Sequence, residues 1–233
     1  MRRRLVHCAA VALLVGVTMP AATHARSVSV SAGSGPSDYV IDHVRTKEPI
    51  FFITVDDGSH LTRPTLQYIR NMRIPITTFA LPEQLNRHRR RFVNLLRQTG
   101  MTFENHSQTH RLVSTMSFAA QKAEICAGTR EVRRVIRRTP AFFRPPGGGW
   151  NEDTVRAARA CKVSRIVLWN VVADHGSLVR ADGGSGLRRG DIVLLHYLDS
   201  LPTSLDVVLR AASKAGLRPV LLRDHLATAT PDD

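Results

Sequence analysis

Short apolar runs and longer segments of helical periodicity alternate along the chain from about residue 47 onward. The apolar or β-branched runs have the length of strands, and they are Ile50–Val55, Ile76–Leu81, Met101–Glu104, Ala141–Phe143, Val163–Val172, Asp191–His196 and Arg218–Leu222. Segments with helical patterning separate most of them, at Leu61–Arg73, Pro82–Gln98, Ser117–Arg138, Asn151–Ala160 and Thr203–Lys214. This order is typical of a parallel sheet whose strands are joined by right-handed helical crossovers.

The predicted helices carry start signals and a core-facing stripe. Ser117 and Asn151 are favourable N-cap residues. One face of the predicted helix after Ser117 carries a regular stripe, at Ile125, Thr129, Val132 and Ile136. About seven strand–helix units without a second domain predict an α/β fold, a distorted (β/α) barrel with about seven parallel strands. An open doubly wound sheet is the alternative, although no G-x-G-x-x-G follows the first strand.

The first 25 residues have the features of a secretory signal peptide. Residues 2–4 are all arginine, and the apolar stretch Leu5–Val17 that follows is too short to span a bilayer. Small residues ending at Ala25 resemble a cleavage site. We therefore expect cleavage after Ala25 and export of the mature protein, with an uncleaved anchor as the alternative.

The rest of the chain divides into three expected parts. Residues 26–46 are rich in Ser and Gly and are expected to form a flexible leader. Residues 47–226 form the predicted domain, and residues 227–233 form a short tail.

Composition supports one globular domain and argues against nucleic acid and membrane as partners. Of the 233 residues, 43% are hydrophobic, which excludes a disordered chain. Lys and Arg number 33 against 19 Asp and Glu, so the net charge is +14. The densest basic patch, Arg87–Arg91, has no interleaved aromatic residues, so an arginine-biased, solvated surface is favoured over nucleic-acid binding. No apolar run reaches transmembrane length, and we expect no stable membrane insertion.

Export would leave two cysteines, Cys126 and Cys161, because Cys8 lies within the predicted signal peptide. Two cysteines allow one pairing, and an oxidising exterior favours a disulfide. Two buried free thiols are the alternative.

Polar residues with catalytic potential follow five of the seven predicted strands. The loops after barrel strands carry the active site, and here they contain Asp56, Asp57, His106, His110, Arg144, Asp174 and His196. Two histidines four residues apart are expected on one face of a helical turn, where a carboxylate completes a His₂-Asp metal site. Adjacent aspartates on a strand project to opposite sides, so one can bind metal while the other handles a proton.

These segments resemble the motifs of the polysaccharide deacetylases, the NodB-homology domains of carbohydrate esterase family 4. Thr54–Gly58 (TVDDG) is similar to the first motif of the family, T-F-D-D-G, and His106–His110 (HSQTH) matches H-[ST]-x-x-H. Arg144–Gly148 (RPPGG) resembles R-x-P-Y-G, and Ile192–His196 resembles the closing motif that ends in histidine. The resemblance covers residues 47–225 and implies a distorted barrel of about seven strands.

Two positions depart from the family pattern. The tyrosine of the third motif is Gly147, which keeps the backbone amide of the oxyanion hole but not the aromatic side chain. The fourth motif, usually D-x-x-D-W, is reduced to Asp174 without a following tryptophan.

The resemblance assigns a role to each matching residue. Asp57, His106 and His110 would bind a divalent metal ion, with zinc as the expected one. Asp56 would be the general base, held and kept ionised by Arg144. His196 would protonate the leaving group, and Asp174 would steer either His196 or Arg144. Four further residues would face the substrate: Pro146, Gly147, Leu194 and Trp150. Leu194 is expected to line the acetyl pocket, and core packing is the alternative for Trp150.

The expected function is hydrolytic deacetylation of a polysaccharide outside the cell or at the cell wall. N-acetylglucosamine units of peptidoglycan or a chitin-like polymer are the first choice, and the anionic cell wall is the expected partner. An esterase for O-acetyl groups of a xylan-type polysaccharide and an inactive glycan-binding module of the same fold are the alternatives.

Overall fold

The computed structural model describes residues 39–226. The predicted signal peptide, the leader up to residue 38 and the predicted tail lie outside the described residues. Within this range one sheet contains β1 (Val40–Ile41), β2 (Ile50–Asp57), β3 (Ile76–Ala80), β4 (Thr102–Asn105), β5 (Phe142–Phe143), β6 (Arg165–Val167), β7 (Val171–Val172), β8 (Val179–Arg180), β9 (Ile192–His196) and β10 (Arg218–Val220). The helices are α1 (Arg63–Met72), α2 (Pro82–Arg87), α3 (Arg89–Thr99), α4 (Phe118–Ile136), α5 (Glu152–Ala160), α6 (Leu201–Ala215) and α7 (Leu222–His225), with 3₁₀ turns at Val113–Thr115 and Pro146–Gly148.

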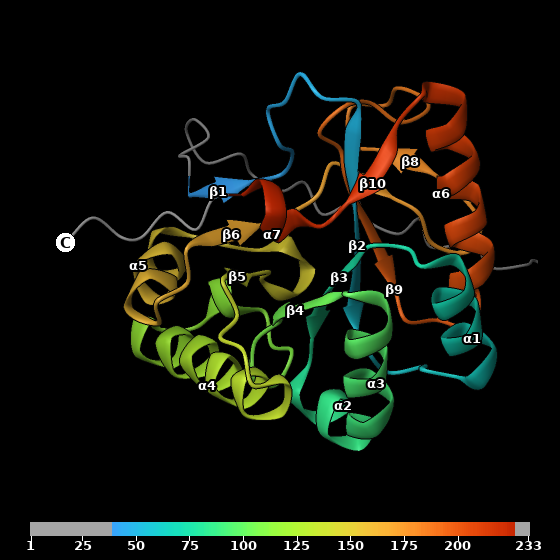
Figure 1. Cartoon of the computed structure of the whole chain (residues 1–233). Helices are drawn as coiled ribbons and strands as arrows, with labels where there is room; N and C mark the ends of the chain where they lie inside the picture. Colours follow the sequence, from blue (N-terminus) through green and yellow to red (C-terminus); the bar gives the residue numbers. More distant parts are fainter. Residues whose placement is uncertain (1–38, 227–233) are drawn as a thin grey trace, which may run out of the picture. The chain divides into compact units, whose positions relative to one another are not determined.

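The sheet confirms the predicted fold. Its strands follow the order β1-β6-β5-β4-β3-β2-β9-β7-β8, and β10 joins β2. All of these strand pairs are parallel except β7–β8. Figure 1 shows the helices around the outer side of the curled sheet, with α4 and α5 beside β4–β6, and α1 and α6 beside β2 and β9. The result is a distorted (β/α) barrel whose strands direct their carboxyl ends to one face.

All seven predicted apolar runs contain strands, but Val163–Val172 does not form one continuous strand. It splits into β6, which pairs with β1 and β5, and β7, which pairs with β8 and β9. Asn170 lies in the break, and its side chain accepts a hydrogen bond from the Ile192 N–H (3.0 Å) and donates one to Asp191 (2.8 Å). The Asn170 side chain thus takes the place of a backbone acceptor for the Ile192 N–H, while the Asn170 N–H still donates to the Ile192 carbonyl oxygen, and the barrel is distorted here.

Two other boundaries differ from those predicted. The expected helix Pro82–Gln98 is interrupted at His88, whose φ of −110° and ψ of 20° leave helical geometry. Arginines at neighbouring helical positions repel one another, which weakens a continuous helix through residues 87–91. The domain also begins before residue 47, because Val40 and Ile41 of the expected leader form β1 and pair with β6.

The core confirms the predicted stripe of α4. Ile125, Val132 and Ile136 are buried, as is Thr129. Side chains cap the helices where predicted, since Ser117 accepts the Ala120 N–H, and Asn151 forms a capping box with Thr154. Among the described residues, no helix is both long and apolar enough to cross a membrane.

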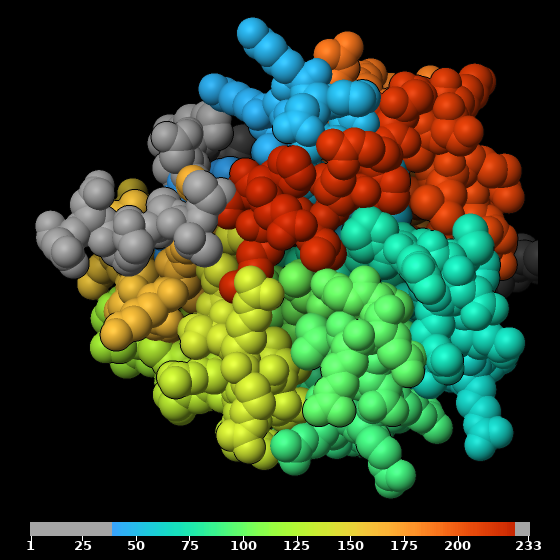
Figure 2. Space-filling model, viewed as in Figure 1, coloured from blue at the N-terminus to red at the C-terminus, as the bar shows by residue number. Residues whose placement is uncertain are grey.

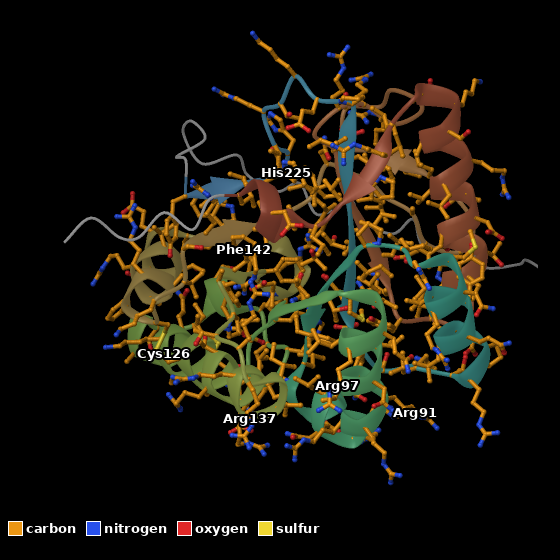
Figure 3. The ribbon with its side chains drawn as sticks, in the orientation of Figure 1. Arg91, Arg97, Cys126, Arg137, Phe142 and His225 are labelled. Atoms are coloured by element: carbon orange, nitrogen blue, oxygen red, sulfur yellow. A yellow bond between two sulfur atoms is a disulfide. The ribbon has the colours of Figure 1, made fainter. Side chains whose placement is uncertain are left out.

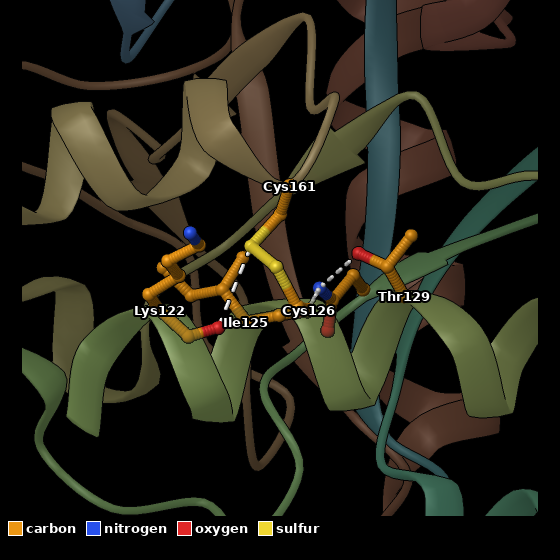
Figure 4. The surroundings of a disulfide bond; sticks show 6 residues. Lys122, Ile125, Cys126, Thr129 and Cys161 are labelled. Carbon is orange, nitrogen blue, oxygen red and sulfur yellow. Dashed lines mark hydrogen bonds between the residues drawn. A yellow bond between two sulfur atoms is a disulfide. The ribbon is translucent and has the colours of Figure 1, made fainter. Parts of the chain in front are cut away.

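A disulfide joins Cys126 in α4 to Cys161 at the end of α5. Figure 4 shows this bond between the two helices, where the Cys161 sulfur also contacts the Lys122 carbonyl oxygen. The bond closes a segment of 35 residues. It therefore ties together two helices that cover the same part of the sheet.

Removing the disulfide is expected to lower the free energy of unfolding. A variant with both Cys126→Ala and Cys161→Ala regains the chain entropy of a 35-residue loop in the unfolded state, a loss of stability of at most about 4 kcal/mol. Urea unfolding followed by far-ultraviolet circular dichroism measures the difference. Reductant should lower the wild-type midpoint and leave the double variant unchanged. Equal midpoints for the variant and the oxidised wild type would contradict the prediction.

Candidate active site

Parallel pairing brings the predicted site residues to one face of the barrel. Asp56 at the end of β2 lies beside His196 at the end of β9 in the strand register. His106 follows β4 directly, and Arg144 follows β5 directly. The four strand ends therefore bring a carboxylate, two imidazoles and a guanidinium to the same space.

Three donor side chains form a compact cluster that fits a metal ion. The Asp57 Oδ1 lies 3.5 Å from the His106 Nε2 and 3.4 Å from the His110 Nε2, and one ligand atom from each residue lies within 4.8 Å of the others. Bonds of about 2.0–2.1 Å to a tetrahedral zinc ion separate neighbouring ligand atoms by roughly 3.4 Å. The two measured distances match this separation.

Two further observations favour a cation at this cluster. The Asp57 Oδ1 is buried and has no hydrogen-bond partner among the described residues, which is costly for a carboxylate oxygen unless a cation is bound. The His106 Nδ1 lies 2.9 Å from the Arg144 carbonyl oxygen, a contact that fixes the ring and turns Nε2 toward Asp57. Burial lowers the pKa of His106, against the opposing effect of Asp56 and Asp57. The ring is thus held in the neutral form that metals require.

The histidines belong to a loop and not to the helical turn expected from their spacing. Ser107 and His110 have positive φ angles of 70° and 61°, and Asp57 has one of 74°. Non-glycine residues adopt this backbone conformation at a cost and are found in it at functional sites. The left-handed backbone at Ser107 and His110, and not a helix, brings the His106 and His110 rings together, with their centroids 5.0 Å apart.

Helix α4 holds this loop in place through contacts that the sequence motifs do not reveal. Glu124 accepts hydrogen bonds from the Gln108 N–H (3.1 Å) and from the Thr109 N–H (2.9 Å). Gly128 lets the helix approach closely, because a Cβ there would lie 2.8 Å from the Ser107 backbone. Helix α4, which contains none of the predicted site residues, therefore fixes the loop that contains His106 and His110.

Asn105 joins this support from the end of β4. Its side chain donates to the Ile125 carbonyl oxygen and to Thr129, and it accepts the Ser107 N–H at 2.9 Å. No spacing signal in the sequence identifies Asn105 or Glu124, because their hydrogen bonds join helix α4 to a loop whose path is not regular.

Asp56 and Arg144 form a buried ion pair beside the cluster. Both side chains are almost fully buried, and the Arg144 Nη1 donates to the Asp56 Oδ1 at 2.8 Å. The guanidinium also donates to Thr54 and lies between the rings of Phe79 and Trp169, 4.1 and 5.5 Å from their centroids. The other Asp56 oxygen lies 3.7 Å from the His106 Nε2. Arg144 thus fixes one oxygen of Asp56 and leaves the second directed at the metal-binding cluster.

Asp174 orients His196, and not Arg144. One Asp174 oxygen accepts the His196 backbone N–H at 3.0 Å, and the other lies 2.7 Å from the His196 Nδ1. Burial acts to lower the pKa of His196, but the bond to Asp174 and the nearby carboxylates of Asp56 and Asp57 outweigh it, so the net shift is upward. The imidazole is about one third exposed, which leaves its free nitrogen accessible to a substrate.

Of the four residues expected to face the substrate, Gly147 and Leu194 lie on the side of the site, whereas Pro146 and Trp150 are packed within the protein. Gly147 is exposed with a φ of 64°, and Leu194 lies on the same face of β9 as His196. Pro146 is buried within a 3₁₀ turn. Trp150 packs against the apolar cluster that contains Val113, so the structure shows the core-packing alternative and gives no sign of a sugar platform.

Leu112 is a candidate substrate-contacting residue that the sequence motifs do not indicate. It is 55% exposed, two residues after His110. A Cβ added at Gly147 would lie 3.0 Å from the Leu112 Cδ2. The space beside the glycine that replaces the expected aromatic residue is therefore bordered by an aliphatic side chain from a different loop.

Comparison with known proteins agrees with the motifs. The family model for polysaccharide deacetylases matches residues 43–166. An uncharacterized protein of Streptomyces coelicolor is 32% identical over 192 residues, covering 80% of this chain and 77% of that protein. A peptidoglycan-N-acetylglucosamine deacetylase of Bacillus cereus is 28% identical over 170 residues, covering 69% of this chain and 78% of that protein.

A solved structure supports the same fold. The family 4 carbohydrate esterase pseudoenzyme of Bacillus anthracis superimposes with a TM-score of 0.69 at 17% identity, covering 83% of this chain and 70% of that one. The family match spans more than half of the chain and contains the first three motifs, while Asp174 and His196 lie beyond it. The protein belongs to the polysaccharide deacetylase family of carbohydrate esterases and is a deacetylase hydrolase.

Proposed function

We propose that the protein is an exported, metal-dependent enzyme that removes N-acetyl groups from N-acetylglucosamine units of peptidoglycan or a chitin-like polymer. One observation carries the proposal: the Asp57-His106-His110 cluster lies beside the buried Asp56, which Arg144 holds, and Asp56 is in register with His196, which Asp174 holds. The similarity to a peptidoglycan deacetylase supports the choice of glycan. The basic start and apolar stretch of residues 1–25 support export.

Asp57, His106 and His110 would hold the metal ion, for which zinc is the best match to one carboxylate and two imidazoles. The bound ion supplies Lewis acidity toward the acetyl carbonyl oxygen and lowers the pKa of a water molecule. Asp56 takes a proton from the attacking water through the oxygen that Arg144 leaves free. The Gly147 amide binds the developing oxyanion, and His196 donates a proton to the departing amine.

The experiment that tests this function measures acetate release from peptidoglycan, chitin oligomers and acetylated xylan in parallel. Release from peptidoglycan or chitin oligomers, suppressed by a chelator and restored by zinc, is the expected result. Release from xylan alone would overturn the N-acetyl assignment. Absence of release from all three, in a preparation that contains stoichiometric metal, would indicate an inactive glycan-binding protein.

The pH dependence of activity tests the pairing of Asp174 with His196. His196 acts in its protonated form, so activity falls as the pH rises through its pKa, and the upward shift extends activity to higher pH. Asp174→Asn removes the carboxylate that raises this pKa, and the alkaline limb of kcat/KM is expected to move to lower pH. Asp42→Asn, which changes an exposed aspartate, is the control. If kcat/KM of Asp174→Asn falls by the same factor at every pH and its alkaline limb does not move, Asp174 is needed only for structure.

A further inference from the structure

A groove on the outer side of the barrel gathers arginines from two helices. It runs between α3 and the end of α4 and has a volume of about 700 Å³. Arg89, Arg90 and Arg97 border it from α3, and Arg137 borders it from the end of α4. Figure 3 shows Arg97 and Arg137 on neighbouring elements, and Figure 2 shows the surface of α3 beside that of the segment that ends α4.

These arginines are not neutralised by the protein. The groove is lined by five arginines and no acidic residue, and only Arg87 is paired, with Glu83 outside the groove. Within residues 39–226, no acidic side chain lies within ion-pair distance of Arg89, Arg90, Arg97 or Arg137, and all four are exposed. Burial and the nearby charges of Arg91 and Arg87 lower the pKa of His88, which agrees with a positive local field. Such a concentration of cations attracts a polyanion.

The spacing of the arginines and the residues between them indicate which kind of polyanion the groove fits. Arg90 and Arg97 are two helical turns apart, about 10 Å along the axis, so a single phosphate cannot contact both. The spaces between the arginines are lined by Val93, Leu96 and Ile136, which suit carbon chains. They are also lined by the amides of Asn86 and Asn94, whose N–H groups can donate to hydroxyl groups, while the Asn86 Oδ1 already accepts a hydrogen bond from Arg134. No aromatic side chain lines the groove, so the stacking surface that single-stranded nucleic acids use is missing.

We propose that this groove binds a linear polymer of alternating phosphodiester and polyol groups, of the kind attached to bacterial cell walls. Guanidinium groups bind phosphate oxygens in a bidentate manner, and the polyol units would contact the apolar and amide surface. The groove follows the outer face of α3 and is separate from the metal-binding cluster, so binding there anchors the enzyme to the wall without occupying the active site. The biological setting rests on the proposed export, but the binding itself does not.

The test compares two variants of the full chain that lose equal charge. The groove variant carries Arg97→Ser and Arg137→Ser. The control carries Arg210→Ser and Lys214→Ser, both exposed on α6 and outside the groove. Arg97 and Lys214 both lie in the last turn of a helix, and Arg137 is the C-cap residue of α4, so the groove variant loses one more favourable charge at a helix end than the control. Thermal unfolding verifies that both variants fold.

Affinity for poly(glycerol phosphate) of defined length is measured by fluorescence anisotropy at about 50 and 200 mM salt. The groove variant is expected to bind at least about tenfold more weakly than the wild type, with a smaller salt dependence, and the control less than twofold. Equal weakening of both variants would show attraction by net charge alone and would overturn the proposal. Equally tight wild-type binding to single-stranded DNA or to anionic phosphatidylglycerol vesicles would overturn it too.

Acetate release from chitin oligomers is measured on the same preparations and is expected to be equal in all three. If release is absent while binding follows the expected order, the proposed function fails and the groove proposal stands. If release is present and no preparation binds the polymer, the groove proposal fails alone.

Discussion

Asp56→Asn is expected to keep the metal and lose the activity. The amide retains the shape of the side chain and can still contact Arg144, but it cannot accept a proton from water. Loss of a general base lowers the rate by a factor of about 10²–10⁴. Because Asp56 is buried and bonded to a buried arginine, replacement by an isosteric residue is required, and alanine would leave the Arg144 charge without a partner.

Metal content by atomic emission and acetate release are measured on the same preparation. Asp42→Asn, at an exposed position, serves as the control for an Asp-to-Asn change elsewhere in the chain and should retain normal turnover. Normal turnover by Asp56→Asn would show that another group is the base. Loss of metal together with activity would show that Asp56 is a metal ligand. This outcome is compatible with the 3.7 Å distance between the Asp56 Oδ2 and the His106 Nε2.

Asp57→Ala and His110→Ala are each expected to lose metal and activity together. Each change removes one of three donor atoms that lie within 4.8 Å of one another, and two remaining ligands do not hold zinc in the manner of a catalytic site. Activity should fall to the level of the chelator-treated wild type. Added zinc should restore part of it only at concentrations far above those that saturate the wild type.

His43→Ala is the matched control for the histidine variant, because His43 is exposed and pairs with Asp42 away from the cluster. It should keep both zinc and turnover. Retention of stoichiometric zinc by Asp57→Ala would remove Asp57 from the ligand set. The same result for His110→Ala would leave the buried His106 as the only essential imidazole of the pair.

The parallel arrangement of the sheet explains why most of the site was predictable. When strands run in one direction, residues that end them must meet. This argument selects Asp56, His106, Arg144 and His196 as candidates, and the family motifs assign their roles. Regular periodicity likewise identified α4 and its buried stripe. These predictions depend on repeated geometry, which a sequence expresses directly.

Irregular backbone limited the remaining predictions. The break in Val163–Val172 contains Asn170, whose side chain accepts the Ile192 N–H in place of a backbone carbonyl oxygen. The path of the loop between His106 and His110 depends on positive φ angles at Ser107 and His110. The partner of Asp174 could be identified only when the turn after β7 was seen to approach His196. In each case long-range contacts decide the local structure, and no periodic pattern records them.

Helix α4 also has a consequence for how sequences of this family can diverge. Within residues 124–129, closely spaced positions hold the loop, pack the core, form the disulfide and allow close approach to the end of β4. This short stretch contains no predicted site residue, yet a substitution of Glu124 or Gly128 is expected to displace the loop that contains His106 and His110. Arg130 and Arg133 are exposed on the same helix and take no part in holding the loop or packing the core. Over evolutionary time the inner side of this helix should drift as slowly as the motifs themselves, while its outer side drifts freely.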